Sequence, residues 1–218
     1  MKKTIIISSL SLLFVTGCSL DKENSSASNN SSNTSKSTQI DDNRTVISSH
    51  GKYTSLASDL DELENSSPII VEVTKNSEEQ TVKKESDKNT IPTEFYTMSE
   101  VTIKDIQKDT TKSLKNGDKI KVLESVATNV PVEGKKRTLT VDNYKKMEIG
   151  KSYYLYLRDS TSGDNYVLTN AFLSKFPAKE EAKNKLFLSE DNVTESIEDT
   201  DYKDLYEEVY SDVLEENK

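Results

Sequence analysis

Residues 19 to about 45 form a stretch in which serine, asparagine and threonine dominate and almost no side chain is apolar. A segment of this composition cannot bury enough apolar surface to offset the entropy lost on folding, so it predicts a flexible tether. The apolar residues are concentrated in the first 17 positions and between about residues 56 and 177, with a sparser set near the C-terminus. We therefore expect the fold to begin near Tyr53.

The residues before the tether have the organisation of a secretory signal. Met1-Lys2-Lys3 is positively charged, and an apolar run from Thr4 to Val15 follows it. That run is too short to span a bilayer of about 30 Å as a helix. Val15-Thr16-Gly17-Cys18 then resembles the lipobox of bacterial lipoproteins, in which the cysteine thiol is joined to diacylglycerol and cleavage makes that cysteine the first residue.

The resemblance implies that Cys18, the only cysteine of the chain, is lipidated and holds the protein at the extracytoplasmic face of the cell membrane. Two acyl chains, at about 0.8 kcal/mol per buried CH₂, would anchor it stably. The tether is similar to those of lipoproteins from Gram-positive bacteria, although its composition would equally suit an outer-membrane lipoprotein. An ordinary signal peptide with an unrelated cysteine and a short uncleaved anchor stay open as alternatives.

The region 53–177 has the alternation of a mainly β domain. Its clearest strand is Ser152–Arg158, where Tyr153, Leu155 and Leu157 share one face while Tyr154 and Tyr156 share the other, and a returning strand Tyr166–Thr169 follows. Because both faces of the first strand are apolar or amphipathic, we expect both to contact protein. Further strands are expected at residues 68–75, 94–106 and 119–124.

One short helix precedes the strands, with Thr54 as its cap and Leu56, Leu60 and Leu63 on one face. No crossover helix is expected between strands, so antiparallel pairing is favoured, and a small sheet removes its edges by curling into a partly open barrel. Residues 76–92 are expected to be a loop or a flexible hairpin, and residues 126–143 a loop with room for a short edge strand at Arg137–Val141.

The stretches "NGDKIKV", "MEIGKSYYLYL" and "GDNYVL" resemble the strand and turn pattern of a known type of barrel. Their order is similar to that of OB-like barrels in secreted bacterial proteins and, distantly, to the netrin and metalloproteinase-inhibitor type of barrel. The predicted organisation is therefore a signal peptide (1–17), a lipidated cysteine with its tether (18–52), a small OB-like β-barrel (53–177) and an acidic C-terminal extension (178–218).

The C-terminal extension is expected to be partly helical. Its apolar side chains recur at helical spacing, at Tyr202, Leu205, Tyr206, Val209 and Val213. Such an amphipathic helix would cover an edge of the barrel or fray in solvent, and the alternative is a helix that docks on a partner.

The charge of the chain argues against several kinds of partner. The formal net charge is −9, and removal of residues 1–17 takes away Lys2 and Lys3 and no acidic residue, which leaves 27 basic and 38 acidic residues and a charge of −11. Nucleic-acid binding and electrostatic adsorption to anionic lipid both require basic surface, so we expect neither. Membrane attachment is expected through Cys18 alone.

The residues also predict no catalytic site, no metal site and no cofactor. The only histidine, His50, lies in a polar segment beside the tether, and the only cysteine is assigned to lipid, so no Ser-His-Asp or Cys-His arrangement can be assembled. The acidic residues occur in runs such as Glu78-Glu79 and Glu215-Glu216, which are typical of solvated faces. Calcium ligands at 159–164 or 198–201 would lack the spacing of an EF-hand loop.

Tyrosine is the residue type that points to binding. The chain has ten tyrosines and no tryptophan, and tyrosine provides a large amphipathic contact area with few rotatable bonds. We expect several tyrosines in the core, and a binding face formed by Tyr154, Tyr156 and Tyr166 with neighbouring loops. The segments 76–92 and 126–143 are the candidate binding loops, because OB-like and inhibitor-type barrels bind through loops and one sheet face. The predicted function is a non-catalytic binding module for an extracytoplasmic protein or envelope component. The alternative is an immunity or inhibitor lipoprotein that intercepts a toxin, bacteriocin or protease.

Overall fold

A computed structural model describes residues 45–51, 56–84, 90–188 and 200–218. The predicted signal peptide, Cys18, most of the tether and the proposed helix cap Thr54 lie outside the described residues. Among the residues that are described, no helix is long and apolar enough to cross a membrane.

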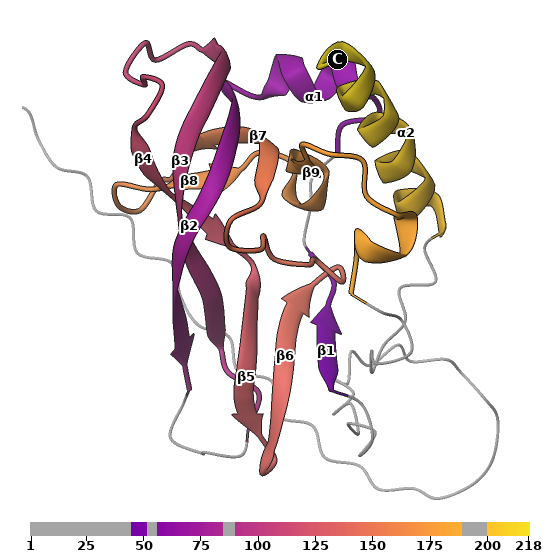
Figure 1. Cartoon of the computed structure of the whole chain (residues 1–218). Helices are drawn as coiled ribbons and strands as arrows, with labels where there is room; N and C mark the ends of the chain where they lie inside the picture. Colours follow the sequence, from indigo (N-terminus) through magenta and orange to yellow (C-terminus); the bar gives the residue numbers. More distant parts are fainter. Residues whose placement is uncertain (1–44, 52–55, 85–89, 189–199) are drawn as a thin grey trace, which may run out of the picture. The chain divides into compact units, whose positions relative to one another are not determined.

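Five strands close into a small barrel (Figure 1): β2 (Ile69–Lys83), β3 (Glu94–Asp109), β4 (Lys119–Glu124), β8 (Tyr166–Leu168) and β7 (Ser152–Asp159). Each strand pairs with the next in that order, and β7 pairs back onto the first half of β2. This confirms the mainly β, small barrel-like fold. Antiparallel pairing was favoured, and two pairs depart from it: β4 and β8 run parallel in the barrel, and β1 (Val46–Ser49) and β6 (Lys135–Val141) run parallel beside it.

The interior of the barrel contains the side chains that alternation predicts. Tyr153, Leu155 and Leu157 of β7 point inward and are buried, while Tyr154 and Tyr156 point outward and are buried by other elements. The inner cluster is completed by side chains from β2, β3, β4 and the segment before β7: Ile69, Val71, Val73, Val101, Ile103, Ile120, Val122 and Met147. Both faces of β7 therefore contact protein, as predicted.

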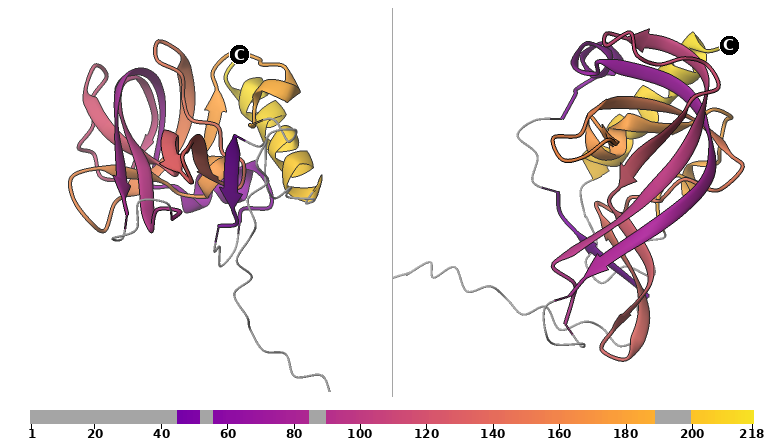
Figure 2. Two further views of the ribbon diagram at one scale, coloured as in Figure 1. Left: turned by 90° about the horizontal axis from the view of Figure 1, so that it is seen from below. Right: turned by 90° about the vertical axis from the view of Figure 1, so that its left-hand side faces the viewer.

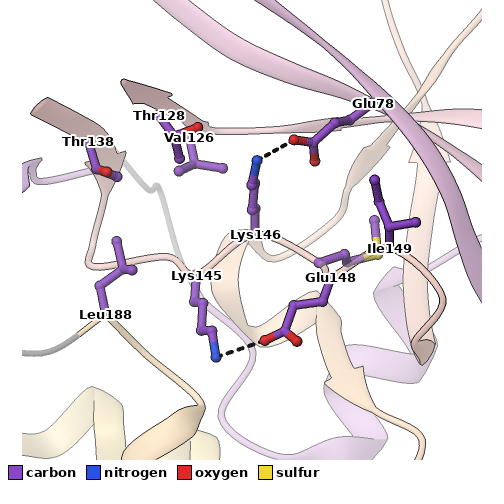
Figure 3. Close-up of a pocket in the computed structure, with 10 residues that line it drawn as sticks. Glu78, Val126, Thr128, Thr138, Lys145, Lys146, Glu148, Ile149 and Leu188 are labelled. Carbon is purple, nitrogen blue, oxygen red and sulfur yellow. Dashed lines mark hydrogen bonds and ion pairs between the residues drawn. The ribbon is translucent and has the colours of Figure 1, made fainter. Parts of the chain in front are cut away.

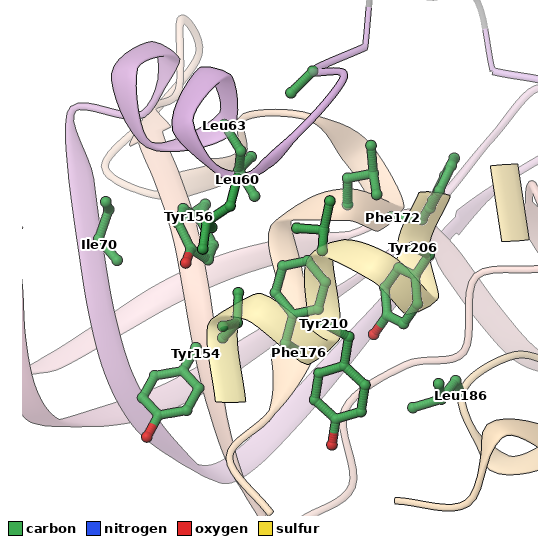
Figure 4. Packing of buried hydrophobic residues seen from close by; sticks show 14 of the residues in the cluster. Leu60, Leu63, Ile70, Tyr154, Tyr156, Phe172, Phe176, Leu186, Tyr206 and Tyr210 are labelled. Atoms are coloured by element: carbon green, nitrogen blue, oxygen red, sulfur yellow. The ribbon is translucent and has the colours of Figure 1, made fainter. Parts of the chain in front are cut away.

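Two helices cover the outer face of β7 (Figure 4). Helix α1 (Leu60–Ser66) buries Leu60 and Leu63 there, and its N-cap is Asp59, whose carboxylate accepts from the backbone N–H of Glu62 at 2.8 Å. The predicted cap at Thr54 is therefore wrong, and Leu56 precedes the helix. Helix α2 (Thr200–Glu216) confirms the amphipathic helix expected in the acidic extension. Its buried side chains are Tyr206, Val209, Tyr210 and Val213. They pack in the cluster on the outer face of β7, together with the short β9 (Lys175–Pro177) and the 3₁₀ turn η1 (Ala171–Ser174).

A second, three-stranded sheet lies beside the barrel (Figures 1 and 2). It consists of β1 (Val46–Ser49), β6 (Lys135–Val141) and β5 (Val126–Val132), with β1 parallel to β6. The segment of β1 was predicted to be part of the 18–52 tether, and that prediction is wrong for these four residues. The segment is a strand because Val46 and Ser48 alternate as buried residues, and Ser48 Oγ accepts from the Asn143 N–H at 2.9 Å.

The polar segments 76–92 and 126–143 contain more strand than expected, and the hairpin alternative for 76–92 is the one observed. Residues 76–83 continue β2 and pair with β3, and residues 126–141 form the β5–β6 hairpin around Glu133-Gly134. Gly134 has a φ of +75°, a left-handed conformation that glycine adopts without a steric penalty. The hairpin is stabilised by a small core of its own that the sequence pattern did not reveal: Ala127, Val130, Val132 and Leu139.

Candidate functional site

An open groove of about 390 Å³ lies where the β5–β6 hairpin meets the barrel (Figure 3). Its apolar lining consists of Val126, Met147, Ile149 and Leu188, and Ile149 is 62% exposed. Hydroxyl groups of Thr128 and Thr138 lie on the hairpin side. The volume is within the range of ligand-binding pockets, about 300–1,000 Å³.

Two ion pairs form the charged part of the groove wall (Figure 3). Lys146 pairs with Glu78 of β2, and Lys145 pairs with Glu148 at 3.1 Å. Burial alone would raise the pKa of Glu78, but hydrogen bonds from Lys146 and Lys75 outweigh it and lower that pKa. The hydrogen bond and charge of Lys145 likewise lower the pKa of Glu148. Both carboxylates are therefore ionised at neutral pH and paired within the wall.

Beneath the groove lies a fully buried ion pair. Lys75 Nζ is 3.2 Å from Glu124 Oε1, and neither side chain is exposed to solvent. The ammonium group also donates to Met147 O at 2.8 Å and to Glu78 Oε2 at 2.6 Å, which uses all three of its protons. The backbone of Met147, which lines the groove, is thus held directly by the buried lysine.

Glu124, the other member of the buried pair, also binds the backbone of Met147. Its Oε2 accepts from the Met147 N–H at 2.7 Å and from the Tyr144 hydroxyl at 2.7 Å, while Oε1 accepts from Ser99. Burial and the neighbouring charge of Glu124 raise the pKa of the Tyr144 phenol well above its usual value, so the phenol remains a donor. Lys75 and Glu124 together fix both backbone polar groups of Met147.

A second buried lysine supports the neighbouring residue of the wall. Lys175 of β9 donates from Nζ to the carbonyl of Lys145, and Nζ lies 4.3 Å from the centre of the Tyr144 ring. Burial lowers the pKa of Lys175 to about 8, against the opposing attraction of Glu124. The ring faces of the surrounding tyrosines offer a cation partial compensation for lost hydration.

The chemistry available to this arrangement is that of a preorganised contact surface. The ionisable side chains described above each have an opposite charge or a backbone group as a partner, and they fix the positions of residues 145–148. The groove exposes apolar side chains, the hydroxyl groups of Thr128 and Thr138, and charged groups of both signs. A surface of this kind suits recognition of a partner that is itself mixed in polarity.

The predicted tyrosine face is not formed. Tyr156 and Tyr154 are 1% and 7% exposed and lie in the cluster beneath the two helices, whereas the half-buried Tyr166 packs on the barrel interior. The three side chains therefore belong to two different cores. The sequence predicted a contact surface at these tyrosines because it does not show that α2 packs on the outer face of β7.

The other candidate residues are placed as follows. His50 is 63% exposed at its side chain, and its Nδ1 lies 3.5 Å from Asp142. Cys18 lies outside the described residues. The segments 76–92 and 126–143, predicted as candidate binding loops, contribute Glu78, Val126, Thr128 and Thr138 to the groove. Glu78 was expected on a solvated face, and the structure instead places its carboxylate between Lys75 and Lys146.

A signal for the buried pair was present in the sequence. Lys75 continues the alternation of Val71 and Val73, and Glu124 continues that of Ile120 and Val122, so both occupy inward positions of their strands. A charged residue at an inward position requires a partner when it is buried. The pairing itself depends on contacts between distant strands, which no local pattern encodes.

Comparison with known proteins adds no assignment. No protein-family model matches the chain, and no curated protein matches it.

Proposed function

We propose that this protein is a lipoprotein, anchored by diacylglycerol on Cys18 at the extracytoplasmic face of the cell membrane, whose barrel acts as a non-catalytic binding module. The anchor is supported by the order of charge, apolar run, small residues and cysteine in residues 1–18. The ligand is an extracytoplasmic protein or another component of the cell envelope.

One observation carries the binding proposal: the groove backbone around Met147 is fixed from below by a fully buried ion pair. A buried charge pair adds little net stability compared with apolar residues of similar size, and its best-attested use is to specify one arrangement. Preorganised surfaces lose less conformational entropy when they bind. We infer that Lys75 and Glu124 serve to hold the groove in its binding shape.

Site-specific photo-crosslinking in the producing cell tests this function. A photoreactive phenylalanine analogue at Ile149, in the groove, should give one discrete adduct of higher mass, whereas the same analogue at Ile91, which is 43% exposed and outside the groove lining, should not. Thr138→Arg, which places a long side chain in the groove, should abolish the adduct at position 149. Equal crosslinking from both positions, or an adduct that Thr138→Arg leaves intact, would rule out the groove as the binding site. An immunity or inhibitor role predicts instead an adduct that forms only on exposure to the intercepted agent.

A further inference from the structure

The outer face of the barrel carries a row of apolar side chains that belongs to none of its cores. Met98 of β3 is directly opposite Leu123 of β4, and Leu123 is directly opposite Val167 of β8. Residues directly opposite one another in a sheet point to the same face, and this face is the outer one, because the inward positions of these strands are filled by the barrel cluster. Each of the three side chains is half-buried, and none packs into the three clusters formed by the described residues.

Opposite charges flank this row. Met98 is paired in register with Glu79 of β2 at one end, and Val167 is paired with Arg158 of β7 at the other. Both charged residues are exposed. The outer row therefore reads Glu79, Met98, Leu123, Val167, Arg158 across five neighbouring strands, and it begins with an acid and ends with a base.

A row with this order is complementary to itself. A two-fold axis through Leu123, lying in the plane of contact and perpendicular to the row, brings a second copy face to face with the row reversed. Leu123 then meets its counterpart, Met98 meets Val167, and Glu79 meets Arg158 at both ends. An axis along the row would instead place like charges together, which is unfavourable.

In the part of the chain that the structure describes, the row is accessible to a second copy of the protein. Helix α2 covers the opposite side of the barrel from β4 (Figures 1 and 2). On β7, the helices bury the outward Tyr154 and Tyr156, but Arg158, at the end of the row, is exposed. Because the barrel surface is convex, three apolar side chains form the centre of the contact and the long side chains of Glu79 and Arg158 extend from its flanks. We propose that the protein self-associates through this row into a weak, two-fold symmetric dimer, an isologous contact in which each copy presents the same residues. The proposal is independent of what the groove binds.

Charge reversal tests the dimer by analytical ultracentrifugation of the chain carrying Cys18→Ser, so that neither lipid nor thiol contributes to association. Glu79→Arg alone and Arg158→Glu alone should each weaken self-association by about tenfold or more, because like charges then face each other at both ends. An equimolar mixture of the two variants should associate again, since each copy of one variant meets opposite charges on the other. Leu123→Asp should abolish association, and Lys136→Glu, a charge reversal at an exposed position of β6, should leave it unchanged.

Each other result overturns the proposal. A wild-type chain that stays monomeric at its highest soluble concentration has no dimer to explain. Association that survives Leu123→Asp uses another surface. A mixture of Glu79→Arg and Arg158→Glu that fails to recover, while each variant remains folded by circular dichroism, contradicts the pairing of these two residues across the axis.

Discussion

Replacing Glu124 by alanine is expected to lower the free energy of unfolding by about 3–5 kcal/mol, the usual cost of removing one partner from a buried ion pair. The substitution leaves the Lys75 ammonium without its buried counter-ion and removes the acceptor of the Tyr144 hydroxyl and of the Met147 N–H. Unsatisfied buried donors add to the loss. Urea denaturation followed by circular dichroism measures the change, read from the midpoint at constant slope.

The matched control is Glu100→Ala, which removes the partner of Lys119 in a pair whose side chains are 35% and 64% exposed. An exposed pair contributes about 0–1 kcal/mol, so this variant should unfold nearly as the wild type does. The double variant Lys75→Met, Glu124→Leu removes both charges and should recover much of the stability lost in Glu124→Ala. If Glu124→Ala and Glu100→Ala cost the same, the buried pair does not support the fold as described.

Tyr206→Ala is expected to release α2 from the barrel. The free energy that holds α2 in place should fall by about 3–5 kcal/mol, the usual loss when a large buried aromatic side chain is replaced by alanine. The Tyr206 ring lies 5.0 Å from that of Phe176 and 4.9 Å from that of Phe187 between ring centres, and its hydroxyl donates to Lys175 O at 2.8 Å. Most helical stability in proteins comes from tertiary packing of an amphipathic face, so α2 depends on these contacts. Hydrogen exchange should show that the α2 amides lose protection while the β2–β3 amides keep theirs.

Two variants separate the contributions of the ring and the hydroxyl. Tyr206→Phe keeps the ring and should cost only about 1 kcal/mol, the usual value of one hydrogen bond. Tyr202→Ala removes a tyrosine of the same helix that is 40% exposed, and it should leave most α2 protection intact. Should Tyr202→Ala and Tyr206→Ala prove equally damaging, the packing of α2 through its buried face would be disproved.

The strands that alternate strongly, and the C-terminal helix, could be predicted from the sequence because their burial follows a local period. Ser152–Arg158 shows its two faces directly in the order of its residues, and the α2 stripe repeats at helical spacing. The β5–β6 hairpin was expected to be a loop because Pro131 and a glycine interrupt a polar segment. In the structure Pro131 is exposed, and Asn129 has a φ of +56° at an irregularity in the pairing, so the strand accommodates both.

Two of the segments that line the groove, 76–92 and 126–143, could be predicted as binding candidates, but the groove itself could not, because its residues also come from the connection 145–149 and Leu188. Only the tertiary fold brings these segments together. The inward positions of Lys75 and Glu124 follow from the alternation of their strands, but their pairing does not, since it depends on contacts between distant strands. Val46–Ser49 was missed for a related reason: four residues beside a serine-rich stretch become a strand only when β6 provides the pairing.

We propose that Cys18 carries the lipid anchor and that the barrel therefore acts at the membrane surface. Intact-mass analysis of the protein extracted from membranes, together with metabolic labelling by an alkyne-bearing fatty acid, tests it directly. We predict a mature chain that begins at Cys18, carries diacylglycerol and takes up the label, whereas Cys18→Ser is unlabelled and leaves the membrane fraction. An unmodified thiol in a chain that still carries residues 1–17 would contradict the account.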